Sequence, residues 1–85
     1  MPVAESKLPI FDNTQKYIEV GYNIAYDRKH AGLTQEQLAE QVGISRQHMG
    51  AIEAPNICRP LSLDLLFNIA AVLDIPPARL LDFRE

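Results

Sequence analysis

The sequence of 85 residues contains one cysteine and few aromatic residues, which make up 7% of the chain. A lone cysteine cannot form an intramolecular disulfide, which fits the reducing environment of the cytosol. Valine and threonine are also scarce, and these residue types and the aromatics are the ones that favour β-strands. The shortages together predict an all-α protein, and the length allows one compact domain rather than two.

Long apolar segments are missing as well. The longest uninterrupted run is Ile69–Leu73, whereas a membrane-spanning helix needs roughly 18 or more apolar residues. The first residues lack the apolar segment of a secretory signal. We therefore expect a cytoplasmic protein without a membrane partner. The hydrophobic fraction of 47% is still sufficient for a small core.

An excess of positive charge is also absent, since the formal net charge is −3. Most small DNA-binding domains are basic, but DNA contacts only one face of a protein. Between residues 28 and 59 the chain has four cations and three anions, a net charge of +1. The remaining acidic residues lie toward the two ends. This distribution permits DNA binding but does not by itself argue for it.

No set of residues has the spacing of a catalytic motif. Serine, histidine and carboxylate residues do not form a recognisable catalytic arrangement, and no glycine-rich phosphate loop occurs. The two histidines are isolated from other metal-ligating residues. We predict that the protein is not an enzyme and uses neither cofactor nor metal. Cys58 is next to Arg59 in the sequence. Two interpretations of this cysteine stay open: a redox switch, or simply an ordinary thiol.

Helix signals fill the chain after a tail assigned to residues 1–15, so that the folded domain is expected over 16–85. Apolar residues recur at spacings of three and four, and serine, threonine, glycine and proline mark the helix ends. The predicted helices cover residues 15–31, 35–42 and 46–54, a fourth stretch capped by Ser62, and a short fifth that begins at Pro77.

The region from residue 34 to 54 has the pattern of a helix-turn-helix. Thr34 and Gln37 have the spacing of a capping box, and Gly43 provides backbone freedom for a sharp turn. Ser45 is suited to cap the next helix. That helix would present Arg46 and Gln47 at its positive end, where such side chains can bond to base edges in a major groove.

Two stretches resemble the phage repressor and Cro family, also called the XRE family of helix-turn-helix regulators. They are VGYNIAYDRKHAGLTQEQLAEQVGISRQHMGAIE and SLDLLFNIAAVLDIPPARLL. The resemblance implies a five-helix, lambda-repressor-like domain that binds double-stranded DNA. It also implies roles for individual residues: base contacts for Arg46, Gln47 and Ala51, backbone contacts for Thr34, Gln35, His48 and Arg59, and a structural pair between Arg28 and Glu53.

The expected function is that of a transcription regulator of the repressor type, acting as a homodimer on a palindromic operator. Leu63, Phe67 and Phe83 are candidates for the dimer surface, and a regulatory protein is a further possible partner. Three features depart from the family pattern: a cation-poor loop after Glu53, Gly50 within the third helix, and Asp27 where apolar residues are common. The first two of these features, together with the acidic pI of about 5.3, motivate an alternative: a protein-interaction module, such as an antitoxin-like or anti-repressor partner, which keeps the fold without base contacts.

Overall fold

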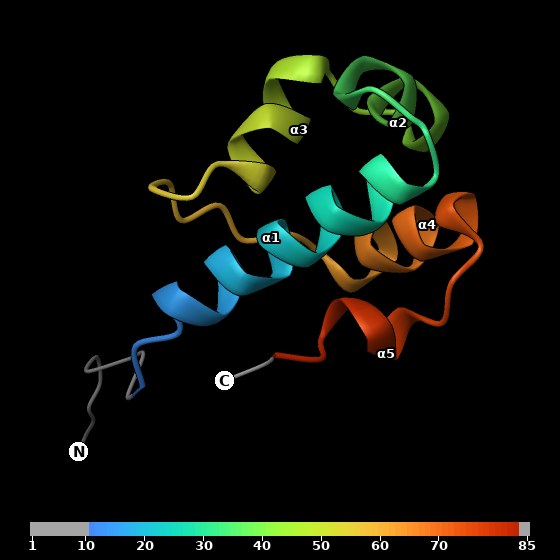
Figure 1. Ribbon diagram of the computed structural model, residues 1–85. Coiled ribbons are helices and arrows are strands. Elements are labelled where there is room, and N and C mark those ends of the chain that lie inside the picture. The colour runs from blue at the N-terminus through green and yellow to red at the C-terminus, as the bar shows by residue number, and fades with distance from the viewer. Residues whose placement is uncertain (1–10, 84–85) are drawn as a thin grey trace.

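The computed structural model describes residues 11–83, which form five helices (Figure 1). They are α1 (Thr14–His30), α2 (Gln35–Val42), α3 (Arg46–Glu53), α4 (Leu63–Leu73) and α5 (Pro77–Leu80). No strand occurs in this range, and the all-α prediction is confirmed. α1 begins one residue before its predicted start. Residues 1–10 of the predicted tail and residues 84–85 lie outside the described part.

Short-range side-chain hydrogen bonds mark where α2, α3 and α4 begin. The Thr34 hydroxyl accepts a bond from the Gln37 N–H at 3.0 Å, and the Gln37 amide oxygen accepts one from the Thr34 N–H at 2.8 Å. Ser45 and Ser62 cap α3 and α4 through their hydroxyl groups. Gly43 ends α2 with a φ of +80°, a left-handed conformation that costs glycine little. The chain therefore enters and leaves these helices at residues with suitable chemistry.

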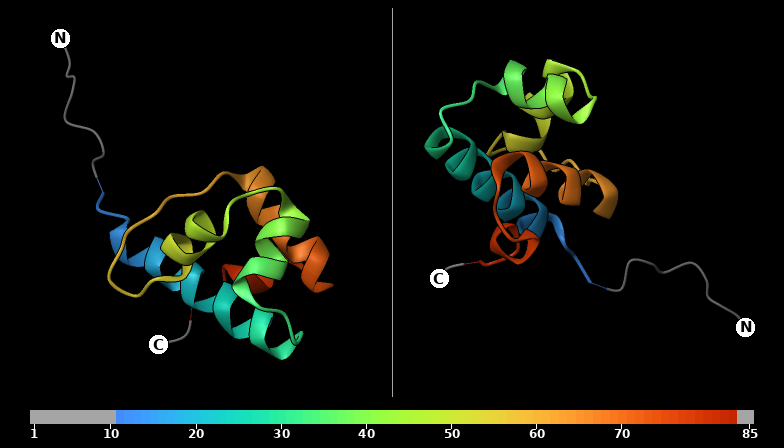
Figure 2. Two further views of the ribbon diagram at one scale, coloured as in Figure 1. Left: turned by 90° about the horizontal axis from the view of Figure 1, so that it is seen from above. Right: turned by 90° about the vertical axis from the view of Figure 1, so that its right-hand side faces the viewer.

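The long helix α1 packs against α3, α4 and α5. Figure 1 shows α2 and α3 above α1 and α5 below it, and Figure 2 shows the same packing from two further sides. α3 packs on α1 and α2, while α4 connects α2 with α5. Every helix contributes to one core, whose largest fully buried side chains are Ile24, Leu38, Met49, Ile52, Ile69 and Leu80.

Gly21 allows α1 and α3 to approach each other closely. A Cβ atom built at this position would overlap the carbonyl oxygen of Ile52, and it would also lie 3.3 Å from the Cα atom of Glu53. These are backbone atoms, which cannot rotate away as a flexible side chain would. The absence of a side chain at residue 21 therefore sets the distance between α1 and α3.

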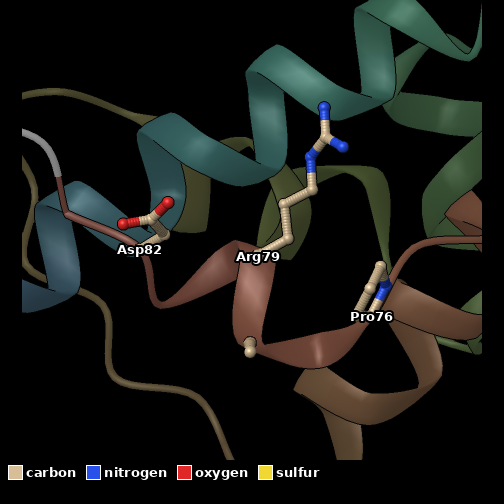
Figure 3. A pocket seen from close by; sticks show the side chains of 4 residues that line it. Pro76, Arg79 and Asp82 are labelled. Carbon is tan, nitrogen blue, oxygen red and sulfur yellow. The ribbon is translucent and has the colours of Figure 1, made fainter.

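Polar contacts attach α5 to the opposite side of α1. Arg79 forms an ion pair with Asp27 at 3.2 Å, and the Asn23 side chain donates to the carbonyl oxygens of Leu80 and Asp82 at 3.1 and 3.2 Å. Figure 3 shows the Arg79 side chain extending from α5 toward α1. Asp27, which departs from the family pattern, is thus buried against α5 instead of facing outward near α3.

Candidate nucleic-acid interface

α2, the turn after it, and α3 form a compact unit on one side of the molecule. Leu38 and Ala39 of α2 and Met49 and Ile52 of α3 are buried between the helices and the rest of the core. Ala39 is small, so the two short helices can lie close together. The N–H of Ile44 donates a hydrogen bond to the carbonyl oxygen of Ala39 at 3.0 Å. The unit thereby leaves the first turn of α3 at the surface.

A buried ion pair holds the end of α3 to α1. The Arg28 guanidinium donates to both carboxylate oxygens of Glu53, from Nε to Oε2 at 2.8 Å and from Nη2 to Oε1 at 2.9 Å. Its remaining nitrogen donates to the Leu33 carbonyl at 2.7 Å. The two side chains are only 9% and 3% exposed, so solvent screens the pair little. Arg28 thus connects α1, the loop before α2, and α3.

Gln35 joins the same network. Its amide nitrogen donates to Glu53 Oε1 at 2.9 Å, so in this structure the side chain braces α2 against α3 and is not extended into solvent. The Gln35 amide oxygen lies 3.5 Å from where a Cβ of Gly50 would be. The sequence pattern gave no indication of this bond, because the two residues are 18 positions apart.

The start of α2 offers backbone donors next to this network. Within residues 11–83, no hydrogen bond engages the N–H groups of Gln35 and Glu36. First-turn N–H groups carry the positive end of the helix dipole and are suited to bind a phosphate. Thr34 is exposed at the same end, but its hydroxyl is engaged in the capping box.

A shallow hollow lies between α3 and the segment that precedes α4. Viewed from above, α3 and this segment run beside each other (Figure 2, left). Four of the predicted DNA-contacting residues line the hollow although one of them is outside the helix-turn-helix, and no carboxylate is among the lining residues. The lining consists of Ser45, Gln47, His48, Ala51 and Arg59.

Arg46 lies beside this hollow without lining it. It is the first residue of α3 and is exposed, as is Gln47. The Ser45 hydroxyl accepts a hydrogen bond from the His48 N–H at 3.0 Å, which fixes the first turn from which both side chains project. A guanidinium and an amide on the exposed end of a firmly packed helix are suited to contact base edges.

Other kinds of site are not visible in the described part of the chain. Between residues 11 and 83 no three metal-ligating side chains lie close enough together to hold a metal ion. None of the helices in that range has the length and apolar character needed to cross a bilayer. α5 lies across α1 from α3 (Figure 1). A hollow beside α5, lined by Pro76, Ala78, Arg79 and Asp82 (Figure 3), shares no residue with the hollow beside α3.

The helix pair, its left-handed turn and the exposed start of α3 define a helix-turn-helix DNA-binding domain. The helix-turn-helix family model matches residues 24–80, and the chain therefore belongs to the helix-turn-helix family of DNA-binding transcription regulators. Its members are regulators and not enzymes. No curated protein sequence matches the chain.

Solved structures of regulators share the fold over most of the chain. The restriction-modification controller protein C.AhdI from Aeromonas hydrophila is 31% identical, with a TM-score of 0.74 over 82% of this chain and 99% of that one. The N-terminal DNA-binding domain of SinR from Bacillus subtilis is 32% identical, with a TM-score of 0.67 over 78% and 94%. SinR in the structure of its complex with DNA is 33% identical, with a TM-score of 0.68 over 74% of this chain and 98% of that one. The lambda-repressor-like architecture is thereby confirmed.

Proposed function

We propose that this protein binds a specific double-stranded DNA sequence as a homodimer and represses transcription. The observation that carries the proposal is the juxtaposition of Gln47, Ala51 and Arg59 around one polar hollow, with Arg46 exposed beside it. These residues come from two separate segments, yet they lie together at α3, whose first turn is exposed. SinR, which shares the fold, has been solved bound to DNA.

Each residue has a proposed role that its position supports. Arg46 and Gln47 contact base edges, and Ala51 contacts a thymine methyl group. The free first-turn N–H groups of Gln35 and Glu36 bind a phosphate, with Thr34 fixing the turn. His48 and Arg59 contact the sugar–phosphate backbone on the other side of α3. The side chain of Gln35 contributes indirectly, because it orients α3 through Glu53.

A stripe on α4 is the surface that we propose for the DNA-binding dimer. Leu63 and Phe67 are 64% and 47% exposed, and Ala71 is exposed four positions farther on. Residues at this spacing share one face of a helix. We call Leu63, Phe67 and Ala71 the α4 stripe. Phe83, also a candidate from the sequence, is partly buried against the core and is thus a poor contact residue.

The test is to select bound duplexes from a random DNA pool with the wild-type protein and with Arg46→Ala. The wild type should enrich a palindrome with half-sites about 34 Å apart, which suits two recognition helices in successive major grooves. Arg46→Ala should weaken the binding free energy by about 1–3 kcal/mol, and the variant should no longer prefer one base over the others at one position of the site. Lys16→Ala removes an exposed cation of α1 and should leave the enriched sequence unchanged. Enrichment of the same motif by Arg46→Ala would refute its role.

A protein-interaction module is the second candidate function. The net charge of −3 and the exposed apolar side chains favour it, and SinR, 33% identical, has also been solved in complex with SinI. In this case the wild type would bind all duplexes weakly and without sequence preference, and binding would fall steeply with salt. Replacing Arg46 and Gln47 by alanine would then leave a complex with the partner protein intact.

A further inference from the structure

The outer face of α1 carries a second row of side chains that are at least partly exposed to solvent. Glu19, Tyr22, Tyr26 and Lys29 follow at spacings of three, four and three residues, so they lie on one face of the helix. We call these four residues the α1 stripe. Tyr22 is 66% exposed and Tyr26 is 46% exposed. Tyrosine is enriched at protein interfaces because it joins a large apolar ring to a polar tip.

The surface around Tyr22 is shaped to receive side chains. A hollow lies on each side of this residue, and Tyr22 lines both of them. Side chains of one helix pack into such depressions between the side chains of another. Besides Tyr22, one hollow is lined by Gln15, Ile18 and Glu19, and the other by Ala25, Tyr26, Lys29, His30, Glu53 and Pro55.

The Tyr26 ring is already held in place on this face. It lies against the His30 ring with centroids 4.3 Å apart, and the His30 Nδ1 atom is 3.1 Å from the Tyr26 carbonyl oxygen. A side chain that is ordered before binding loses less conformational freedom on binding. The part of the stripe around Tyr26 is therefore preorganised.

The charges along the stripe are arranged symmetrically about residue 24. Glu19 and Lys29 are each five positions from it, and Tyr22 and Tyr26 are each two positions from it. If a second α1 lay antiparallel across the first, Glu19 would face Lys29 of the other copy, and Tyr22 would face Tyr26. A parallel arrangement would instead place identical charges opposite each other. A two-fold axis makes every contact twice, so the pattern is complementary to itself in one orientation.

We propose that the α1 stripe binds a second copy of this chain, with the two α1 helices antiparallel. Lys29 forms no ion pair among residues 11–83, and Glu19 accepts only a long bond of 3.4 Å from Gln15. Both charges are thus available to a partner. The stripe shares no residue with the hollow beside α3 or with the α4 stripe, so copies joined through α4 can associate further through α1.

The proposal is tested by exchanging the two charges and measuring sedimentation velocity over a concentration series. The measurements use the wild type and a Phe67→Ser background, in which the α4 stripe is disrupted. In the Phe67→Ser background, Glu19→Lys and Lys29→Glu should each weaken self-association about tenfold, because two attractions across the contact become repulsions. The double variant should regain the wild-type association. The two single variants should associate with each other when mixed, although neither associates well alone.

Lys16→Glu is the matched control, since it makes the same change of charge at an exposed position of α1 outside the stripe. It should leave association unchanged. In the Phe67→Ser background Tyr22→Ser should abolish association, and circular dichroism should show that this exposed position does not affect folding. An equal effect of Lys16→Glu and Lys29→Glu would overturn the proposal, as would a monomeric Phe67→Ser protein at concentrations up to ~1 mM. These measurements contain no DNA, so failure of the proposed DNA recognition would not alter their result.

Discussion

Asp27 and Arg28 are neighbours on α1, yet their ion pairs hold two different parts of the molecule. Arg28 binds Glu53 at the end of α3 with two hydrogen bonds, and both side chains are almost fully buried. Asp27 binds Arg79 of α5 through a single contact of 3.2 Å, and the arginine is 51% exposed. The helix that presents Arg46 and Gln47 is therefore fixed more firmly than the short C-terminal helix.

The difference follows from what each attachment has to achieve. A base-contacting helix must hold its side chains in a defined position, since a small displacement breaks bidentate bonds. α3 is accordingly fixed by the Gly21 contact, by Glu53, and by the brace from Gln35. α5 has four residues, and it is held mainly by the burial of Leu80 and by bonds from Asn23. The four predictions that follow test this contrast.

The largest effect is expected for Glu53→Ala. It leaves the Arg28 guanidinium buried without its carboxylate and also removes the acceptor of Gln35, so the free energy of unfolding should fall by about 3–5 kcal/mol. Urea denaturation followed by circular dichroism measures the loss. Glu40→Ala, at an exposed position of α2, should change stability by less than about 0.5 kcal/mol. A loss below ~1 kcal/mol for Glu53→Ala would show that the pair does not fix α3.

Gly21→Ala should destabilise the protein by about 1–3 kcal/mol, the usual cost of overpacking. The methyl group meets the Ile52 carbonyl, and separation of α1 from α3 is the only relief. Alanine would otherwise favour the helix by about 1 kcal/mol, so the sign of the change identifies the clash. The measurement is the midpoint of urea denaturation. An unchanged or raised midpoint would mean that α3 can move away at no cost.

Sequence rules located the helices well because helix ends depend on residues within about four positions. Thr34, Gly43, Ser45 and Ser62 function as their chemistry predicts. Arg46 and Gln47 also lie at the exposed start of α3, since their positions follow from the predicted helix start. Local patterns were therefore sufficient for the element order and for the face that α3 presents.

Those rules could not predict contacts between residues that are far apart in the sequence. The bond from Gln35 to Glu53 requires the angle between α2 and α3, which no spacing specifies. Asp27 was noted as unusual, but its partner Arg79 could not be identified until α5 was placed against α1. The contact at Gly21 could not be predicted either, because a glycine in a sequence does not reveal which backbone approaches it.

Gly50→Ala is the counterpart of Gly21→Ala on the opposite side of the α1–α3 contact. The added methyl group would lie 3.5 Å from the Gln35 amide oxygen, an ordinary contact. Helix propensity should therefore raise the free energy of unfolding by about 1 kcal/mol. The methyl group points toward Gln35, which does not line the hollow beside α3. The affinity for the selected DNA should accordingly fall less than tenfold, and a larger loss would place DNA against Gly50 itself.

The smallest effect is expected for Arg79→Ala, at about 0.5–1 kcal/mol. Asp27 is 6% exposed, and a buried carboxylate without a partner would ordinarily cost more. Here, however, Arg79 both contacts Asp27 and lines the open hollow beside α5, so its removal should admit water to Asp27. Thermal unfolding measures the loss, and hydrogen exchange should show faster opening of α5 with α3 unaffected. A loss of 3 kcal/mol or more would make the two ion pairs equivalent, and α5 would then be anchored as firmly as α3.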